Sequence, residues 1–384
     1  MKRFAGLFVS GLVLSAGVLV GAPAEAAPAK FIPAKGKAIP DQYIVVMKDG
    51  PSINAGSAAQ DVGAAPLFVY DAVVNGFAAK LNQGQLKKLQ NNPNVAYIEQ
   101  DGIVSLEATQ TGATWGLDRI DQANLPLNST YNYNATGAGV TAFIIDTGIY
   151  TAHSDFGGRA SVAYDAVGGN GQDCNGHGTH VAGTVGGTRW GVAKQVTLRA
   201  VRVLDCNGSG SNSGVIAGMN YVANNAPARS VANMSLGGGL NTTVNNAATN
   251  MVTRGVAVAI AAGNSNANAC NYSPASASNV LTVAASTNTD AKASFSNYGS
   301  CVELYAPGQN ITSAWIGSTT ATNTISGTSM ASPHVAGVAA LVRQVNSGYT
   351  ATQVHSWIIN NATSGVISGN PSGTPNRLLN KQGL

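Results

Sequence analysis

Residues 139–146 read "GVTAFIID", a short apolar run that ends in an aspartate. Similar runs rich in Val, Ala and Ile recur along the chain, at residues 196–204, 228–236, 255–263 and 279–286. Helical stretches lie between several of them, such as 213–226 and 243–255. Because buried strands alternate with helices, we predict a mainly parallel sheet covered by helices on both faces.

Residues 41–105 have a different character and predict a small α+β unit. The segment 42–48, "QYIVVMK", predicts a strand, and 68–81 predicts one or two more. Residues 82–101 predict a helix, a turn and a final strand. A unit of this size is marginally stable by itself, because small domains bury a smaller fraction of their surface.

The N-terminus has the layout of a secretory signal peptide. Lys2 and Arg3 are followed by a long apolar run and then by Ala24-Glu25-Ala26. The alternative is a membrane anchor, because the run is close to spanning length. Small residues and prolines follow where a stop-transfer pattern belongs, so we expect a secreted, extracellular protein.

The composition indicates a folded chain with a large core. Hydrophobic residues make up 44% and charged residues only 10% of the 384 residues. Disordered chains are usually richer in charge and poorer in apolar residues. The net charge is +4 without a long basic run, so composition gives no argument for nucleic-acid binding.

An exported chain with four cysteines suggests two disulfides. Three pairings are possible. We expect the local one, Cys174–Cys206 with Cys270–Cys301, and the alternative is four buried thiols.

Functional residues of open parallel sheets gather at the carboxyl ends of the strands, where Asp146 stands. A buried carboxylate is costly unless it is paired, and an imidazolium is a suitable partner. The segment 174–183, "CNGHGTHVAG", offers His177 and His180. A zinc site is an alternative, but zinc-protease helices carry histidines at i, i+4 with a glutamate base. We expect His180 to be structural, hydrogen-bonded in the helix.

A third segment, "SGTSMASPHVAG" (326–337), places Ser329 at the start of a predicted helix. A serine there is often only a cap. Together with Asp146 and His177 it completes the residue set of a Ser-His-Asp triad. The chain order Asp, His, Ser is that of subtilisin and differs from that of the α/β-hydrolases.

These motifs give the chain a close resemblance to subtilisin-like serine proteases. Segments such as "DCNGHGTHVAG", "AAGNSNANACNYSPAS" and "ASFSNYGSC" are similar to the proteinase K-like branch, and within it to the aqualysin type of secreted bacterial protease. The resemblance runs from Trp115 to about Leu379. It implies a subtilisin-like fold, and residues 41–105 resemble the inhibitor-type, ferredoxin-like propeptide of the same family.

The resemblance also implies the roles of the catalytic residues. Ser329 corresponds to the nucleophile, His177 to the general base and Asp146 to the carboxylate that orients the imidazole. Asn264 resembles the oxyanion donor. The implied activity is a secreted serine endopeptidase of broad specificity.

Two strand segments resemble the edges between which an extended peptide substrate lies, and a third resembles the wall of the first specificity pocket. The residues concerned are Gly208, Ser209, Gly210, Ser235, Leu236, Gly237, Ala261, Ala262 and Gly263. Small apolar walls imply a preference for apolar or aromatic residues before the cut. The alternative is that these glycines only form turns.

The resemblance implies structural Ca²⁺ at two places. The first corresponds to Ser278, Val280 and Glu303, where Glu and Ser replace the usual Asp and Pro. The second corresponds to Asp118, Asp121 and Gln122, with Asn128 where a relative in this branch has Asp. The alternative for the second set is an ordinary helix cap with surface charges.

We expect a signal peptide at 1–26, a propeptide at 27–107 and a peptidase domain at 108–384, with the cut after Glu107. The propeptide is expected to act as an intramolecular inhibitor of a self-processing, monomeric zymogen that acts on peptides and proteins. Alternatives are a dead protease that binds peptides, an esterase and a zinc hydrolase.

Overall fold

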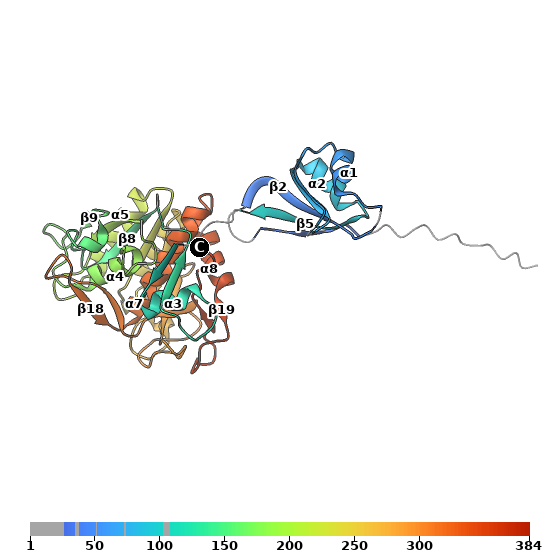
Figure 1. Ribbon diagram of the computed structural model, residues 1–384. Coiled ribbons are helices and arrows are strands. Elements are labelled where there is room, and N and C mark those ends of the chain that lie inside the picture. Colours follow the sequence, from blue (N-terminus) through green and yellow to red (C-terminus); the bar gives the residue numbers. More distant parts are fainter. Residues whose placement is uncertain (1–26, 35–37, 51, 73, 103–107) are drawn as a thin grey trace, which may run out of the picture. The chain divides into compact units, whose positions relative to one another are not determined.

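The computed structural model describes residues 27–384 except 35–37, 51, 73 and 103–107. The expected signal peptide and the expected cut after Glu107 lie outside the described residues. The chain divides into two compact units, Met1–Ile103 and Val104–Leu384 (Figure 1). Among the described residues, no helix is long and apolar enough to cross a membrane.

The smaller unit is a sheet with two helices packed on one face (Figure 1). Its strands and helices are β1 (Lys30–Ile32), β2 (Ala38–Met47), α1 (Ala55–Asp61), β3 (Pro66–Tyr70), β4 (Gly76–Lys80), α2 (Gln83–Gln90) and β5 (Val95–Gly102). The sheet order is β1-β5-β2-β4-β3, and apart from the parallel β1–β5 pair the neighbours are antiparallel. The order of β2 to β5 is the split βαβ arrangement of ferredoxin-like folds.

The elements that contribute large side chains to the core of this unit are the ones that the sequence pattern predicts. Val45, Phe77 and Ile98 are fully buried strand residues, and Leu89 of α2 packs against them. The expected strands and the helix α2 are confirmed. Helix α1 was missed because its sequence, "AGSAAQD", buries only alanines and starts at a cap formed by Asn54.

The larger unit is built on a nine-stranded sheet within the described residues. In spatial order the strands are β19 (Thr363–Ser364), β20 (Arg377–Leu378), β16 (Leu304–Pro307), β15 (Leu281–Ser286), β13 (Ala257–Ala261), β11 (Ser230–Met234), β8 (Thr141–Asp146), β10 (Thr197–Arg202) and β9 (Ala160–Asp165). All neighbours are parallel except β19 and β20. The five strands predicted from apolar runs form its centre, and the expected mainly parallel sheet is confirmed.

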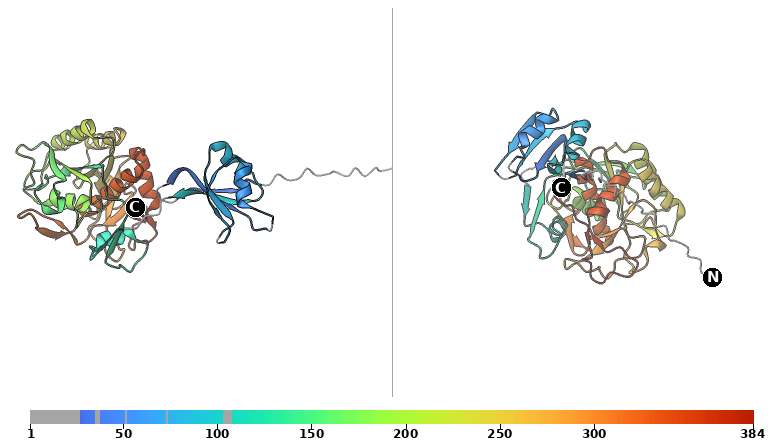
Figure 2. Two further views of the ribbon diagram at one scale, coloured as in Figure 1. Left: turned by 45° about the horizontal axis from the view of Figure 1, so that its top comes forward. Right: turned by 90° about the vertical axis from the view of Figure 1, so that its right-hand side faces the viewer.

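Helices lie on both faces of this sheet. Helices α4 (His177–Gly186) and α7 (Thr328–Val345) pack on each other and on the central strands, with α8 (Ala351–Asn361) beside α7 (Figure 2). Helices α5 (Asn212–Asn225) and α6 (Thr242–Thr253) pack together and on strands of the same sheet. The remaining elements are α3 (Trp115–Asp121), the 3-10 turns Ser154–Phe156 and Ala269–Asn271, and the pairs β6 (Ala108–Thr111) with β7 (Thr130–Tyr133), β12 (Gly238–Gly239) with β14 (Tyr272–Ser273) and β17 (Ile311–Ala314) with β18 (Thr322–Ile325).

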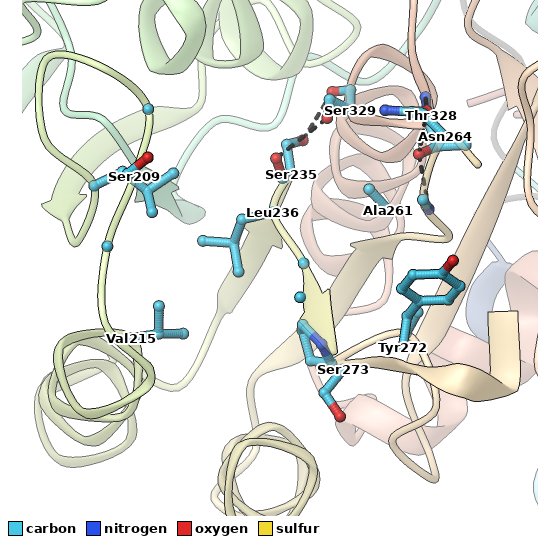
Figure 3. Close-up of a pocket in the computed structure, with 18 of the residues that line it drawn as sticks. Ser209, Val215, Ser235, Leu236, Ala261, Asn264, Tyr272, Ser273, Thr328 and Ser329 are labelled. Atoms are coloured by element: carbon cyan, nitrogen blue, oxygen red, sulfur yellow. Dashed lines mark hydrogen bonds between the residues drawn. The ribbon is translucent and has the colours of Figure 1, made fainter. Parts of the chain in front are cut away.

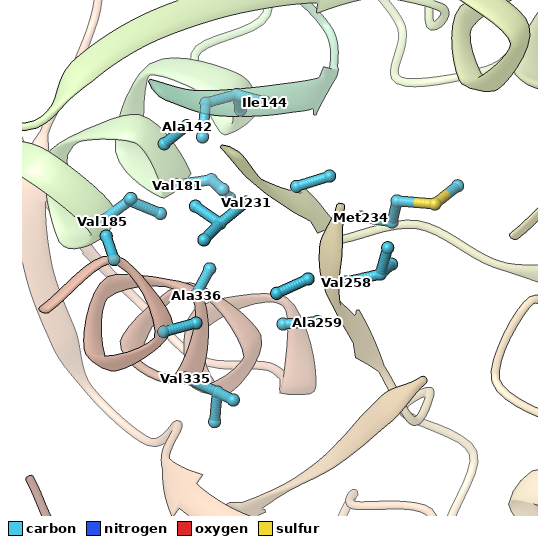
Figure 4. Close-up of a cluster of buried hydrophobic side chains, with 14 of the residues drawn as sticks. Ala142, Ile144, Val181, Val185, Val231, Met234, Val258, Ala259, Val335 and Ala336 are labelled. Atoms are coloured by element: carbon cyan, nitrogen blue, oxygen red, sulfur yellow. The ribbon is translucent and has the colours of Figure 1, made fainter. Parts of the chain in front are cut away.

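Small side chains let α4 and α7 approach closely. Figure 4 shows Val181 and Val185 of α4 on the side of α7 from which Ala336 points, beside the central strands. At Gly337 of α7 an added Cβ would lie 3.2 Å from the Val185 backbone oxygen of α4 and 2.5 Å from the Val192 side chain that follows α4. This packing fixes the two helices whose first turns carry His177 and Ser329.

Both expected disulfides are present. Cys174 pairs with Cys206 and Cys270 with Cys301, with Cα atoms 5.0 and 5.3 Å apart. On the chain-entropy model each bridge contributes about 3–4 kcal/mol. The first bridge ties the segment before His177 to the segment that precedes residues 207–210.

Candidate active site

Asp146 and His177 form a hydrogen-bonded pair between the end of β8 and the start of α4. The His177 Nδ1 lies 2.8 Å from Asp146 Oδ1. Asp146 is fully buried, whereas a quarter of the His177 side chain is exposed. The imidazole therefore donates Nδ1–H to the carboxylate, and its exposed part lines a cleft.

The charges around His177 raise its pKa. Burial of the imidazole acts to lower the pKa, but the charge and hydrogen bond of Asp146 and the charge of Asp173 act in the opposite direction. The net result is a pKa above the usual 6.5. The protonated imidazole is thus stabilised by the site, as a general base requires after it has taken up a proton.

A second buried carboxylate, Asp173, holds the turn that carries His177. Its Oδ1 accepts the backbone N–H of Asn175 and Gly176, and its Oδ2 accepts that of Thr179, at 2.8–2.9 Å. These donors begin α4 and have no acceptor inside the helix. Asp173 belongs to the motif around His177, but the sequence alone does not reveal this role.

Ser329 lies in the first turn of α7, on the same cleft as His177. Its Oγ donates to the Ser235 carbonyl at 3.2 Å, and the Ser235 hydroxyl donates to the Ser329 carbonyl at 2.8 Å (Figure 3). The Ser329 backbone N–H has no acceptor within the helix, because it lies in the first turn. Transfer of the Ser329 proton to His177 requires the hydroxyl to rotate away from Ser235.

Asn264 follows β13 and faces the same cleft. Its Oδ1 accepts the backbone N–H of Thr328 at 2.8 Å and the Thr328 hydroxyl at 2.9 Å (Figure 3). These contacts leave the Nδ2 amide as the free end of the side chain, close to the start of α7. An amide donor and the Ser329 backbone N–H therefore lie beside the candidate nucleophile.

One cleft of about 720 Å³ contains all the expected substrate residues. Its walls include Gly208, Ser209, Gly210, Ser235, Leu236, Gly237, Ala261, Ala262 and Gly263. Figure 3 shows Ser209 and Val215 across the cleft from Ser235 and Leu236, with Tyr272 near Ala261. The sequence analysis missed Val215 and Tyr272, because their positions on α5 and β14 reveal nothing of the cleft until the chain folds.

Among the residues that the structure describes, none of the histidines, cysteines and carboxylates gather into a zinc ligand set. Cys174 is in a disulfide, and His180 Nε2 lies 2.9 Å from the Ile311 carbonyl. Burial lowers the pKa of His180 to about 4, so the ring is neutral at ordinary pH. The partner of His180 lies on β17 rather than in its own helix, which corrects the expected helix-internal bond.

The first candidate calcium set combines one carboxylate with two backbone carbonyls. The Glu303 carboxylate is half-buried, and burial raises its pKa despite the nearby charge of Arg377. Among the described residues this carboxylate has no hydrogen-bonding partner. Val280 is buried and lies close to Ser278 in the sequence. The Ser278 carbonyl accepts the Thr249 hydroxyl at 3.0 Å. Carbonyl and carboxylate oxygens are the ligands that Ca²⁺ prefers.

The residues of the second candidate set make hydrogen bonds within their own loop. The Asp118 carboxylate accepts the backbone N–H groups of Asn128 and Ser129, and Asp121 accepts that of Asn132. Burial raises the pKa of Asp121, and the charge of Lys381 opposes this. The Gln122 amide donates to the carbonyls of Asn124 and Pro126. These contacts close the loop through its own backbone, and Lys381 adds a positive charge that acts on Asp121.

Comparison with known proteins agrees with this geometry. The family model described as "Subtilase family" matches residues 137–384. This chain belongs to the subtilase family. A second model, "Peptidase inhibitor I9", matches residues 42–107.

Individual relatives extend the similarity over most of the chain. An extracellular serine proteinase of Thermus sp. (strain Rt41A) is 51% identical over 89% of this chain and 90% of its own. Proteinase R of Parengyodontium album is 44% identical over 90% and 89%. The crystal structure of a cold-adapted subtilisin-like serine proteinase is 53% identical, with a TM-score of 0.69 over 71% of this chain and 99% of its own.

This subtilase chain is thus a serine peptidase with an inhibitor-type propeptide region. The resemblance to the proteinase K-like branch and the aqualysin type, stated from the sequence, is confirmed. Subtilases commonly bind calcium.

The raised pKa of His177 predicts the pH dependence of activity. A general base must be neutral, so kcat/KM should rise with pH through a midpoint above the usual 6.5. Asp173→Asn removes a charge that raises this pKa and should move the midpoint to lower pH. Asp165→Asn is the matched control, because Asp165 also caps a loop through backbone N–H groups but does not act on His177. A wild-type midpoint at or below 6.5 contradicts the account.

Proposed function

We propose that the chain is a secreted serine endopeptidase of broad specificity. Asp146, His177 and Ser329 act as its triad, and Asn264 is its oxyanion donor. The observation that carries the proposal is the buried Asp146–His177 hydrogen bond of 2.8 Å, on a cleft that Ser329 and Asn264 share. Secretion is supported by the signal-like N-terminus and by the extracellular Thermus relative.

The reaction proceeds in two steps that use the same groups. Ser329 Oγ attacks the scissile carbonyl carbon while its proton passes to His177 Nε2. The carbonyl oxygen becomes an oxyanion and is stabilised by Asn264 Nδ2–H and the Ser329 backbone N–H. His177 then protonates the leaving amine, the C–N bond breaks and an acyl-enzyme remains. Water, deprotonated by His177, hydrolyses this ester and restores Ser329.

The cleft supports recognition of the peptide backbone rather than of particular side chains. The 208–210 and 235–237 segments offer backbone groups to an extended peptide, which binds as an added strand. Ala261, Ala262 and Gly263 form small, apolar walls of the first pocket. We therefore expect apolar or aromatic residues before the cut.

The propeptide region supports a zymogen that processes itself. Its ferredoxin-like unit matches a peptidase-inhibitor family up to residue 107, and the peptidase chain continues with β6 at Ala108. We propose a signal peptide at 1–26, a propeptide at 27–107 and a peptidase domain at 108–384. A compact unit that folds early can also template a slow-folding parallel sheet.

Loss of the Ser329 hydroxyl and loss of the Asn264 amide should lower kcat by different amounts. Ser329→Ala should lower kcat by a factor on the order of 10⁶ and abolish labelling by a serine-directed fluorophosphonate. Asn264→Ala removes one oxyanion donor and should lower kcat by roughly 10²–10³ with little change in KM. Substantial peptidase activity of Ser329→Ala would refute the triad. A drop below about fivefold for Asn264→Ala would refute the oxyanion role.

We further propose one structural Ca²⁺ at Ser278, Val280 and Glu303. Chelation by EGTA of fluorophosphonate-inhibited enzyme should lower Tm by roughly 5–10 °C, because a ligand bound to the folded state stabilises it. Glu303→Gln should lose most of this sensitivity, whereas Asp121→Asn, in the other candidate set, should keep it. A Tm that EGTA leaves unchanged argues against the site.

A further inference from the structure

Asn297 lies outside the cleft and yet contacts the loop that carries Asn264. It follows β15 in the segment "ASFSNYGSC" (293–301), and its side chain is fully buried. It is absent from the residues that line the cleft. The loop above it, residues 262–267, leaves β13 and includes both a wall of the first pocket and the oxyanion donor.

Four hydrogen bonds join Asn297 to this loop on both sides of Asn264. Before Asn264, its Nδ2 donates to the Ala262 carbonyl at 2.8 Å, and its backbone N–H donates to the Gly263 carbonyl at 2.9 Å. After Asn264, its Oδ1 accepts the backbone N–H groups of Ser265 and Ala267, both at 3.0 Å. The side chain of Asn297 thus makes three of these bonds and its backbone N–H makes the fourth, so a single residue holds the turn on both sides of Asn264.

The turn is shaped to this side chain. Gly263 has φ of +102°, a backbone conformation that favours glycine. A Cβ at Gly263 would lie 2.4 Å from Asn297 Nδ2, so a larger residue would displace the amide from its hydrogen bonds.

Two anchors thus hold the proposed oxyanion donor. Thr328 donates hydrogen bonds to Oδ1 of the Asn264 side chain. Asn297 forms hydrogen bonds with the backbone before and after Asn264. Oxyanion stabilisation depends on a donor that lies about 2.7–3.1 Å from the developing charge. A displacement of about 1 Å in a positioning group can cost about 10²-fold in rate.

We propose that Asn297 is a positioning residue, which fixes the loop so that the Asn264 amide meets the oxyanion. This inference rests on the oxyanion role assigned to Asn264 in the proposed function. A positioning role differs from a purely structural role in one respect. A structural residue affects activity whether or not Asn264 is present, whereas a positioning residue acts only through it.

A double-mutant cycle tests this coupling. Asn297→Asp keeps the shape and the Oδ1 acceptor but sets an oxygen against the Ala262 carbonyl, and Asn297→Ala removes the side chain. Each is combined with Asn264→Ala. The kcat and KM for a chromogenic peptide are measured on processed enzyme whose active fraction is titrated with fluorophosphonate, and Tm is recorded for every variant.

Asn297→Asp should lower kcat by roughly 10- to 100-fold, with KM changed by less than about threefold. In the Asn264→Ala background the same change should lower kcat by less than about threefold. Asn376→Asp is the matched control. Asn376 clamps the 365–367 turn through the same kinds of bond, away from the cleft lining, so it should lower Tm without lowering kcat.

Three results overturn the inference. The first is a kcat of both Asn297 variants within about threefold of wild type. The second is an equal loss of kcat in the two backgrounds, which shows a structural role only. The third is a wild-type kcat for Asn264→Ala, since the oxyanion role then falls and the inference with it. Peptidase activity in Ser329→Ala is a separate result, which contradicts the proposed function as a whole.

Discussion

A carboxylate buried at the end of a central strand is the constraint on which the site depends. Asp146 is fully enclosed, and a buried charge is tolerated only when it is paired and hydrogen-bonded. His177 supplies that partner at 2.8 Å, and the same contact raises the pKa of the imidazole. The pairing that makes Asp146 acceptable in the core therefore also prepares His177 to accept a proton.

The parallel sheet brings the other groups to this pair. Strands β8, β11 and β13 are neighbours, so the segments that follow Asp146, Met234 and Ala261 leave the sheet at one edge. Helices α4 and α7 pack through small residues and present His177 and Ser329 in their first turns. Buried polar residues then set the fine geometry: Asp173 holds the start of α4, and Thr328 orients Asn264.

The sequence predicts the central strands better than it predicts the residues that support the candidate site. The short Val- and Ala-rich runs that precede Asp146 and Asn264 are typical of buried strands, so the sequence predicts β8 and β13. Helix α1 lacks such a pattern, since its buried residues are alanines. Asp173 and Asn297 lie in loops and act through contacts with backbone groups, and no periodicity in the chain reveals those contacts. Tyr272 and Val215 reach the cleft only through the tertiary packing of β14 and α5.

The most direct test of the triad and of the domain boundary is the mass of the secreted product of the full chain and of its Ser329→Ala variant. The account predicts that wild type yields a species beginning within a few residues of Ala108, while the variant keeps residues 27–107. This result shows Ser329 to be a nucleophile that cuts its own chain. Equal maturation of both proteins would contradict self-processing, and a wild-type chain that is never cut would contradict the zymogen itself.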